Sequence, residues 1–348
     1  MTAPVYRSGE LVAADWLEIP LPVDPSRDGY RLDRFLSERI RRLSRTRIQM
    51  IIAAGQVRCV ERPGENLRAA SRVHLGQTVV VRRPAPVEPA VPLTADVLHR
   101  DESLMVLGKP AGLPVHPSAR YHRHTLTAVL RAWFGSGHGW QMGHRLDRET
   151  SGVIAFARGP AAAVLKRAFQ HREIEKRYLA IVRGRIDAGG VIDVPIGAAL
   201  GSRVRIKMGP RSLTDGGLPA STTISPLAHG SFRDEPITLV EARPLTGRQH
   251  QIRVHLAYHG YPVLGDKLYG IDEQAFIDVA DHVRLMSELE AELGVSRQAL
   301  HAASIALDHP GLGTRVRITA PWPEELAAII GAPEQPPEAA ARCHPPAP

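Results

Sequence analysis

The sequence is poor in the residues on which disulfide-bonded, zinc-bound and membrane proteins depend. It holds two cysteines, Cys59 and Cys343, and no CxxC pair, which excludes a disulfide framework and a cysteine zinc site. No apolar run approaches the roughly 18 residues of a membrane span, and the N-terminus lacks the basic stretch and apolar core of a secretory signal. We therefore expect a cytoplasmic protein with no membrane partner.

The common motifs of several enzyme classes are also missing. The chain has no P-loop, no GxGxxG after a strand, no GxSxG and no HExxH, which removes support for nucleotide hydrolysis, dinucleotide chemistry and zinc proteolysis. The sixteen histidines invite a metal site, but the spacing of His250 and His255 points their side chains in different directions on a helix and on a strand. We expect neither a metal nor a small-molecule cofactor.

Lysine is scarce, with five residues against 39 arginines, and the positive charge is concentrated in one segment. Residues 31–83 contain thirteen arginines, no lysine and four acidic residues, for a net charge of +9, whereas the rest of the chain has a net charge of −1. A basic segment on a nearly neutral body favours binding to a polyanion, most often a nucleic acid. The alternative is that the arginines only reflect genome composition.

A helical pattern predicts a small domain over residues 30–82. From Leu32 to Leu43, apolar residues recur at helical spacing with arginines between them, which indicates an amphipathic helix with a basic outer face. Ser44 is a candidate N-cap for a second helix that stops at Gly55. The β-branched residues typical of strands then occur at 57–60 and 77–81.

The segments that flank this domain lack a burial pattern. Residues 1–29, in which Pro20, Pro22 and Pro25 break any long element, are predicted to form an extended arm. Residues 83–92, RPAPVEPAVP, are typical of a semi-rigid linker. At the other end of the chain, residues 332–348 are predicted to be disordered.

Residues 93–331 are predicted to form a larger α+β domain. Short apolar runs alternate irregularly with helical stretches, which favours α+β over a doubly wound parallel sheet. Residues 271–294 form a helical, acidic insert whose simplest interpretation is a solvated surface helix, with partner binding as the alternative. The strands are expected at 104–107, 153–156, 179–182 and 238–242, and helices at 126–134 and 161–170.

One polar stretch, GHRLDRETSGVIAFAR at residues 143–158, holds the densest set of reactive side chains. It runs from a turn-forming segment directly into an apolar strand, so Asp147 is expected just before a sheet and close to Arg145 and Arg148. Such a carboxylate is a candidate nucleophile or base. The alternative is that Asp147 only closes a turn through its own backbone.

HRLDRETSG resembles the catalytic signature of the RluA-type pseudouridine synthases, and the resemblance extends along the chain in the order of that family's motifs. The segment 30–82 is similar to the S4 RNA-binding domain, which the RluC and RluD branch of the family carries. The further matching segments are VLGKPAGLPVHPS (106–118), EKRYLAIVRG (175–184), LTGRQHQIRVHLAYHGYPVLGDKLYG (245–270) and RQALHA (297–302).

The resemblance implies an S4 domain followed by an α+β catalytic domain on a mixed, mainly antiparallel sheet with flanking helices. It implies that Asp147 is the catalytic carboxylate, acting on the sugar directly or by assisting glycal formation. Tyr178 would pack on the flipped uracil, and its hydroxyl could help to remove the C5 proton. Arg253 would keep Asp147 ionised through a two-pronged pairing. The pattern around Arg253 fits a strand or a helix, so its conformation stays open.

The resemblance further implies an enzyme that isomerises uridine to pseudouridine in RNA, with large-subunit (23S) ribosomal RNA as the favoured substrate. The alternatives are a tRNA-directed enzyme and a non-catalytic RNA-binding or ribosome-assembly protein. We expect a monomer whose partner is RNA. The residues predicted to contact RNA are Arg34, Arg42, Arg45, Arg47, Lys109, His144, Arg145 and Arg148.

Overall fold

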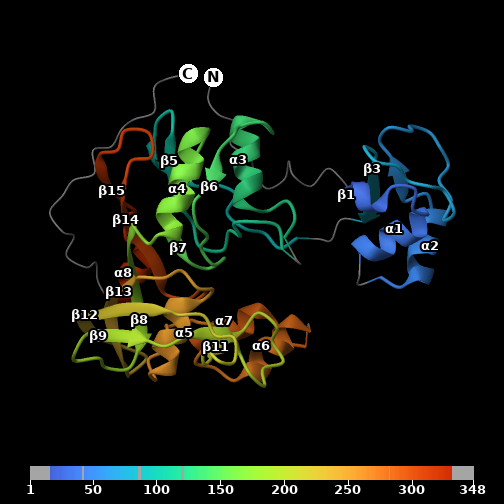
Figure 1. Ribbon diagram of the computed structural model, residues 1–348. Helices are drawn as coiled ribbons and strands as arrows, with labels where there is room; N and C mark the ends of the chain where they lie inside the picture. The colour runs from blue at the N-terminus through green and yellow to red at the C-terminus, as the bar shows by residue number, and fades with distance from the viewer. Residues whose placement is uncertain (1–15, 41–42, 85–87, 119–120, 282, 331–348) are drawn as a thin grey trace. The chain divides into compact units, whose positions relative to one another are not determined.

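The computed structural model describes residues 16–40, 43–84, 88–118, 121–281 and 283–330. The chain divides into a smaller unit within Arg7–Glu88 and a larger unit that continues from Pro89 (Figure 1). Arg42 and the tail at 332–348, for which predictions were made above, lie outside the described residues. Among the described helices, none is long and apolar enough to cross a membrane.

The smaller unit packs two helices against a three-stranded antiparallel sheet. Its sheet has the order β1-β3-β2, and the shared core contains Phe35, Ile48 and Val79. The elements are β1 (Trp16–Pro22), the 3-10 helix η2 (Pro25–Arg27), α1 (Leu32–Arg39), α2 (Arg45–Ala53), β2 (Val57–Cys59) and β3 (Thr78–Pro84). Both helices and the sheet contribute apolar side chains to this small core, which buries them from water.

The second helix of this unit begins and ends at the residues that the sequence indicates. The side chain of Ser44 accepts a hydrogen bond from the Arg47 amide at 3.3 Å, as an N-cap does. Gly55 follows the last turn with a φ of +68°, which glycine adopts without strain.

Three boundaries of the smaller unit differ from the prediction. Residues 16–22, assigned above to an extended arm, form β1, and this edge position tolerates Pro20 and Pro22 because an edge strand need not donate on its outer side. The first helix ends at Arg39 rather than near Leu43. β3 continues to Pro84, into the predicted linker, because its last residues still pair with β1.

The larger unit is built on a ten-stranded sheet. The strands of this sheet are β4 (Asp96–Arg100), β5 (Leu104–Lys109), β6 (Gln141–Met142), β7 (Ser151–Ala157), β8 (Glu175–Arg183), β9 (Gly190–Asp193), β12 (Ser221–Phe232), β13 (Glu235–Pro244), β14 (Leu300–Asp308) and β15 (Arg315–Thr319). The main path runs β4-β5-β7-β14-β8-β13-β12-β9, with β15 beside β14 and β6 beside β7. Of the pairs in this sheet, β14 with β7 is parallel and the others are antiparallel, which confirms the α+β class with a mixed sheet.

Helices pack on the large sheet (Figure 1). α4 (Pro160–Gln170) packs on β7, and α8 (Glu324–Ile330) packs on β12. α5 (Gln251–Tyr258) contacts β12 and β13 on one side and a small second sheet on the other. The unit also contains α3 (Leu126–Phe134), and the small sheet has two strands, β10 (Ile196–Ala198) and β11 (Met208–Pro210).

The acidic insert is not a single solvated helix. It forms two short helices, α6 (Glu273–Ala280) and α7 (Met286–Leu293), which pack on each other through buried apolar side chains that include Val279 and Leu289. Its acidic residues are also engaged, because Glu290 lies 3.2 Å from the ammonium of Lys267. The insert therefore has its own small core and is tied to the body of the larger unit.

Strand β14 brings the predicted catalytic segments together. His301 and Ala302 pair on one side with Ser151 and Gly152 of β7, and on the other side Ala302 pairs with Tyr178 of β8. The approach of β7 is so close that a Cβ on Gly152 would lie 2.1 Å from the Ala302 carbonyl oxygen. Gly152 also has a φ of +110°, so the glycine of the HRLDRETSG segment is required for this strand pairing.

Candidate active site

The loop that carries Asp147 is a hydrogen-bonded turn, and the buried side chain of Lys109 holds its backbone. The Thr150 amide donates to the Asp147 carbonyl at 3.2 Å, and β7 begins one residue later. Lys109 is buried, and its ammonium donates to the carbonyls of Pro110, Leu113 and Arg148 at 2.8–2.9 Å. Three carbonyls satisfy the three donors of an ammonium. Lys109 therefore fixes the backbone directly after Asp147.

The last matching segment, RQALHA, holds the same loop from the other side. The Gln298 amide group donates to the Thr150 hydroxyl at 2.7 Å, and the Ser151 hydroxyl lies 2.8 Å from Nδ1 of His301. All four side chains are buried, so these bonds form away from water, where they are most costly to lose. The two segments, far apart in the sequence, form one rigid support for Asp147.

Asp147 is ionised and partly accessible. Its side chain is 28% exposed, and its Oδ2 accepts a hydrogen bond from Nη1 of Arg253 at 2.8 Å. Burial by itself would raise the pKa of this carboxyl, but the charge and hydrogen bond of Arg253, with a smaller contribution from the charge of Lys109, hold the pKa below its usual range. The site thus keeps a charged carboxylate in a partly buried position.

Arg253 lies in α5, which resolves the alternative left open by the sequence in favour of a helix. Its two-pronged ion pair is made with Asp266 at 2.6 and 2.8 Å, and Asp147 receives a single hydrogen bond. This corrects the predicted two-pronged pairing with Asp147. Asp266 is fully buried and also accepts the backbone amides of Leu268 and Tyr269 at 2.9 and 3.1 Å, so it orients the guanidinium rigidly.

Asp266 is the main functional residue that the sequence reasoning missed. It lies in the matched segment 245–270, thirteen residues after Arg253, and carries no periodic signal. Gly265 directly precedes Asp266, and Gly270 follows four residues later. Gly265 has a φ of +74°, and a Cβ added to it would lie 2.3 Å from the Arg297 carbonyl oxygen. An acidic residue after such a constrained glycine was the available hint.

The start of α5 is fixed by the polar residues of the TGRQHQIR segment. The side-chain carbonyl of Gln251 accepts hydrogen bonds from the Thr246 hydroxyl at 2.6 Å and the Arg248 amide at 3.0 Å. Its amide group donates to the Ser221 carbonyl and the Thr222 hydroxyl at 3.0 and 2.9 Å. Gln251 therefore joins the helix to β12, which sets the position from which Arg253 reaches Asp147.

Tyr178 lies in β8, next to β14, on the strand that borders the Asp147 loop. Burial, together with the negative charge of Asp147, raises the pKa of its hydroxyl above the ordinary range. The hydroxyl therefore stays protonated and is a poor base. A ring that packs against the substrate fits this environment better than removal of the C5 proton does.

Two of the residues predicted to contact RNA have other partners. The ammonium of Lys109 has no donor left for a phosphate, and burial lowers its pKa to about 7. The ring of His144 stacks on Phe169 with centroids 4.6 Å apart, and its Nε2 accepts the Ala155 amide at 3.2 Å. Burial lowers the pKa of His144 to about 3, so it is neutral. Both residues support the fold around Asp147 rather than present charge to RNA.

The described arginines among the predicted RNA contacts are accessible. Arg145 is exposed in the Asp147 loop, and Arg148 is 38% exposed and donates a hydrogen bond to the Tyr121 hydroxyl at 2.6 Å. In the smaller unit, Arg34 lies over the Tyr30 ring, and Arg45 pairs with the buried Asp33 at 3.0 Å while its side chain stays 65% exposed. Arg47 is exposed on the same helix as Arg45.

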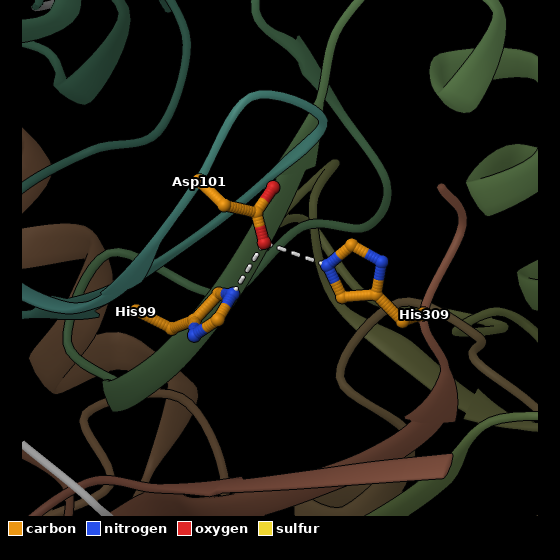
Figure 2. A group of neighbouring side chains, drawn as sticks. All are labelled: His99, Asp101 and His309. Atoms are coloured by element: carbon orange, nitrogen blue, oxygen red, sulfur yellow. Dashed lines mark hydrogen bonds and ion pairs between the residues drawn. The ribbon is translucent and has the colours of Figure 1, made fainter. Parts of the chain in front are cut away.

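A cluster of His99, Asp101 and His309 has the residue types of a metal site (Figure 2). Nδ1 of His309 accepts the backbone amides of Gly311 and Leu312 at 3.2 and 3.1 Å. The proton of a neutral His309 therefore sits on Nε2, which donates to Asp101 at 2.7 Å and has no lone pair for a metal. We interpret the cluster as a set of hydrogen bonds that join the β4–β5 turn to the end of β14. It lies at the opposite end of these strands from Asp147.

The comparisons with known proteins agree on one family. A family model described as RNA pseudouridylate synthase matches residues 103–258. The chain is 34% identical over 320 residues to the ribosomal large subunit pseudouridine synthase D of Zymomonas mobilis, over 87% of this chain and 93% of that protein. It is 32% identical over 327 residues to the ribosomal large subunit pseudouridine synthase C of Pasteurella multocida, over 90% of this chain and 93% of that protein.

A solved structure gives the same result. The human RNA pseudouridylate synthase domain containing 1 superposes with a TM-score of 0.54 at 26% identity, over 72% of this chain and 94% of that one. Together with the ionised Asp147, the Arg253 pairing and the adjacent Tyr178, these matches lead to one conclusion. The chain belongs to the RluA-type RNA pseudouridine synthases, in the branch of synthases C and D, and is an isomerase that converts uridine in RNA to pseudouridine.

Proposed function

We propose that this enzyme modifies uridines of large-subunit (23S) ribosomal RNA and that Asp147 is its catalytic carboxylate. The observation that carries the role of Asp147 is its divided environment. One oxygen, Oδ2, is held by Arg253 at 2.8 Å, while the side chain is 28% exposed and ionised. A charged carboxylate with one committed and one open oxygen is suited to act on a sugar carbon.

The isomerisation needs no oxidant, reductant or added water. The bond between N1 of uracil and C1′ of the ribose breaks, the base turns within the pocket, and a bond forms between C5 and C1′. The C5 proton leaves, and N1 regains a proton, so atoms and electrons balance. Asp147 assists the first bond cleavage. The ring of Tyr178 packs on the turning base, and the Tyr178 hydroxyl stays protonated and neutral. For the isomerisation to happen, the detached base must stay at the site until the new bond forms.

The target nucleotide must leave its stack to reach Asp147, which costs a few kcal/mol. Contacts to the RNA backbone offset this cost. We assign such contacts to Arg145 and Arg148 beside the catalytic loop and to Arg34, Arg45 and Arg47 of the smaller unit, whose two helices and short sheet we interpret as an S4-like RNA-binding domain. Their exposure and the net charge of +9 over residues 31–83 support this assignment.

Ribosomal RNA is favoured over tRNA because the similar synthases D and C named above are large-subunit enzymes. We further propose that the protein acts as a monomer in the cytoplasm, where ribosomal RNA is made in bacteria. The test is a map of pseudouridine in large-subunit ribosomal RNA and in tRNA, from cells with and without the protein. Sites lost from the ribosomal RNA alone would support the proposal, and sites lost from tRNA alone would overturn its choice of substrate.

A further inference from the structure

His250 is a side chain beside Asp147 to which the mechanism above gives no role. It directly precedes α5, and its φ of +56° lies in the left-handed region. A non-glycine residue stays in that region only when its surroundings hold it there, and such residues concentrate at functional sites. Its side chain is 9% exposed, and Nε2 lies 3.9 Å from Oδ1 of Asp147. The backbone conformation therefore places an imidazole nitrogen next to the catalytic carboxylate.

The position of the ring proton of His250 follows from its contact with Tyr269. The hydroxyl oxygen of Tyr269 accepts the Met208 amide at 2.9 Å and lies 2.9 Å from Nδ1 of His250. Because Tyr269 is buried, its own O–H needs an acceptor, and Nδ1 is the acceptor in reach among its described partners. A neutral imidazole that accepts at Nδ1 carries its proton on Nε2. His250 thus presents an N–H group to Asp147.

The ring is also neutral. Burial lowers the pKa of His250 to about 4, although the charge of Asp147 acts in the opposite direction. The group beside the carboxylate is therefore an uncharged hydrogen-bond donor near neutral pH, not a second cation.

A separation of 3.9 Å is too long for a hydrogen bond between Nε2 and Oδ1. Oδ2 is occupied by Arg253, and Oδ1 has no hydrogen bond from the described residues. A donor and an acceptor thus face the same space, and one small group could accept from Nε2–H and donate to Oδ1. A hydroxyl can do both, whereas the carbonyl oxygens of uracil and the phosphate oxygens can only accept.

We propose that Nε2–H of His250 and one lone pair of Oδ1 of Asp147 together bind the 2′-hydroxyl of the target uridine, while the second lone pair of Oδ1 stays available to the sugar carbon. This inference rests on the proposed role of Asp147 at the sugar. Within an RNA chain the 3′ and 5′ oxygens are esterified, so the 2′-hydroxyl is the sugar hydroxyl that remains. It is attached to the carbon next to C1′, so holding it brings the reacting carbon to Asp147. The same contact distinguishes RNA from DNA at the reacting nucleotide.

The test combines two enzymes with two substrates. Wild type and His250→Leu are compared on a ribosomal RNA fragment that contains the mapped target as uridine or as 2′-deoxyuridine, and both single-turnover rate and affinity are measured. We expect His250→Leu to slow the uridine substrate about fivefold to tenfold, the usual effect of one hydrogen bond. The penalty for the 2′-deoxy substrate should then be smaller in His250→Leu than in wild type by the same factor.

Matched variants separate this role from a structural one. His250→Gln restores a donor near the position of Nε2 and should recover part of the 2′-deoxy penalty. His259→Leu, an exposed residue that follows the same helix, should keep the full wild-type penalty. Tyr269→Phe leaves the imidazole in place but removes the hydroxyl that assigns its proton, and should reduce the penalty even if His250→Leu folds poorly.

An equal 2′-deoxy penalty in wild type, His250→Leu and Tyr269→Phe would overturn the inference. The affinity measurement reports binding of the hydroxyl whether or not turnover occurs, so it tests the inference independently of the reaction. Failure of wild type to turn over the uridine substrate, with a 2′-deoxy penalty on affinity that depends on His250, would instead contradict the proposed substrate while supporting the binding of the hydroxyl.

Discussion

Arg253 gives Asp147 one hydrogen bond, of 2.8 Å, and leaves the second oxygen of the carboxylate uncommitted. Two further donors of the guanidinium, on Nε and Nη2, are held by the buried Asp266. Arg253 is therefore held rigidly by the buried carboxylate of Asp266, while one oxygen of Asp147, the proposed catalytic carboxylate, stays available.

Replacing the cation should move the acid limit of the reaction. In wild type the pKa of Asp147 lies below its usual value, so the single-turnover rate should be level from about pH 5 to about pH 6, below the pKa of Lys109 of about 7. In Arg253→Gln, Asp147 is still buried but has lost the neighbouring positive charge, so the pKa of Asp147 rises. The rate should therefore fall as the pH is lowered through the same range. At neutral pH the rate should drop by roughly 100-fold.

The control for this profile is Arg243→Gln, which removes an arginine whose side chain is 65% exposed and paired with Glu241. It should keep the level wild-type profile. A level profile in Arg253→Gln would show that Arg253 does not set the ionisation of Asp147.

Gly152→Ala should destabilise the protein by about 2–4 kcal/mol, because the new Cβ meets the Ala302 backbone and the φ is unfavourable for alanine. Urea unfolding measures the change. Gly137→Ala is the matched control, since a Cβ there meets nothing within 4 Å and should alter stability by less than about 0.5 kcal/mol. Equal effects at both positions would contradict the close pairing of β7 with β14.

Lys109→Met should lower the free energy of unfolding by about 2–4 kcal/mol, because three buried carbonyls lose their donor. The rate should fall as the Asp147 loop loosens, but the salt dependence of RNA binding should not change. Lys166→Met, on the exposed face of α4, serves as the control for loss of a lysine. A reduced salt slope in Lys109→Met would restore the original assignment of Lys109 as a phosphate contact.

The role of the smaller unit is tested by its charge in the intact chain. The double change Arg45→Gln and Arg47→Gln should weaken RNA binding and reduce the slope of log affinity against log salt by about 0.7–0.9 for each lost phosphate contact. The control pair is Arg315→Gln with Arg317→Gln, two arginines of the larger unit that pair with Glu175. An effect of equal size in both pairs would argue against a specific RNA-binding role for the smaller unit.

The sequence predicts the parts of this molecule that depend on local patterns. Ser44 and Gly55 mark the ends of α2 because capping is a property of neighbouring residues. β7 and α3 lie where the apolar patterns indicate. Asp147 was found because the whole HRLDRETSG segment is distinctive.

What the sequence did not predict depends on contacts between distant segments. Whether Arg253 forks with Asp147 or with Asp266 is decided by the packing of α5 against the loop after it, and no spacing rule contains that choice. The burial of Lys109 arises because the end of β5 lies under the Asp147 loop. From sequence alone, a charged residue after an apolar run is predicted to be exposed, because the segment that covers it in the fold is not known.

The most direct test of the account is release of tritium from RNA that carries 5-tritiated uridine, with wild type and Asp147→Asn compared on large-subunit ribosomal RNA. Forming the bond between C5 and C1′ must expel the label. We expect wild type to release tritium, and Asp147→Asn to release none while it binds the same RNA within a few fold of the wild-type affinity. Release of the label by Asp147→Asn at the wild-type rate would contradict the central role of this carboxylate.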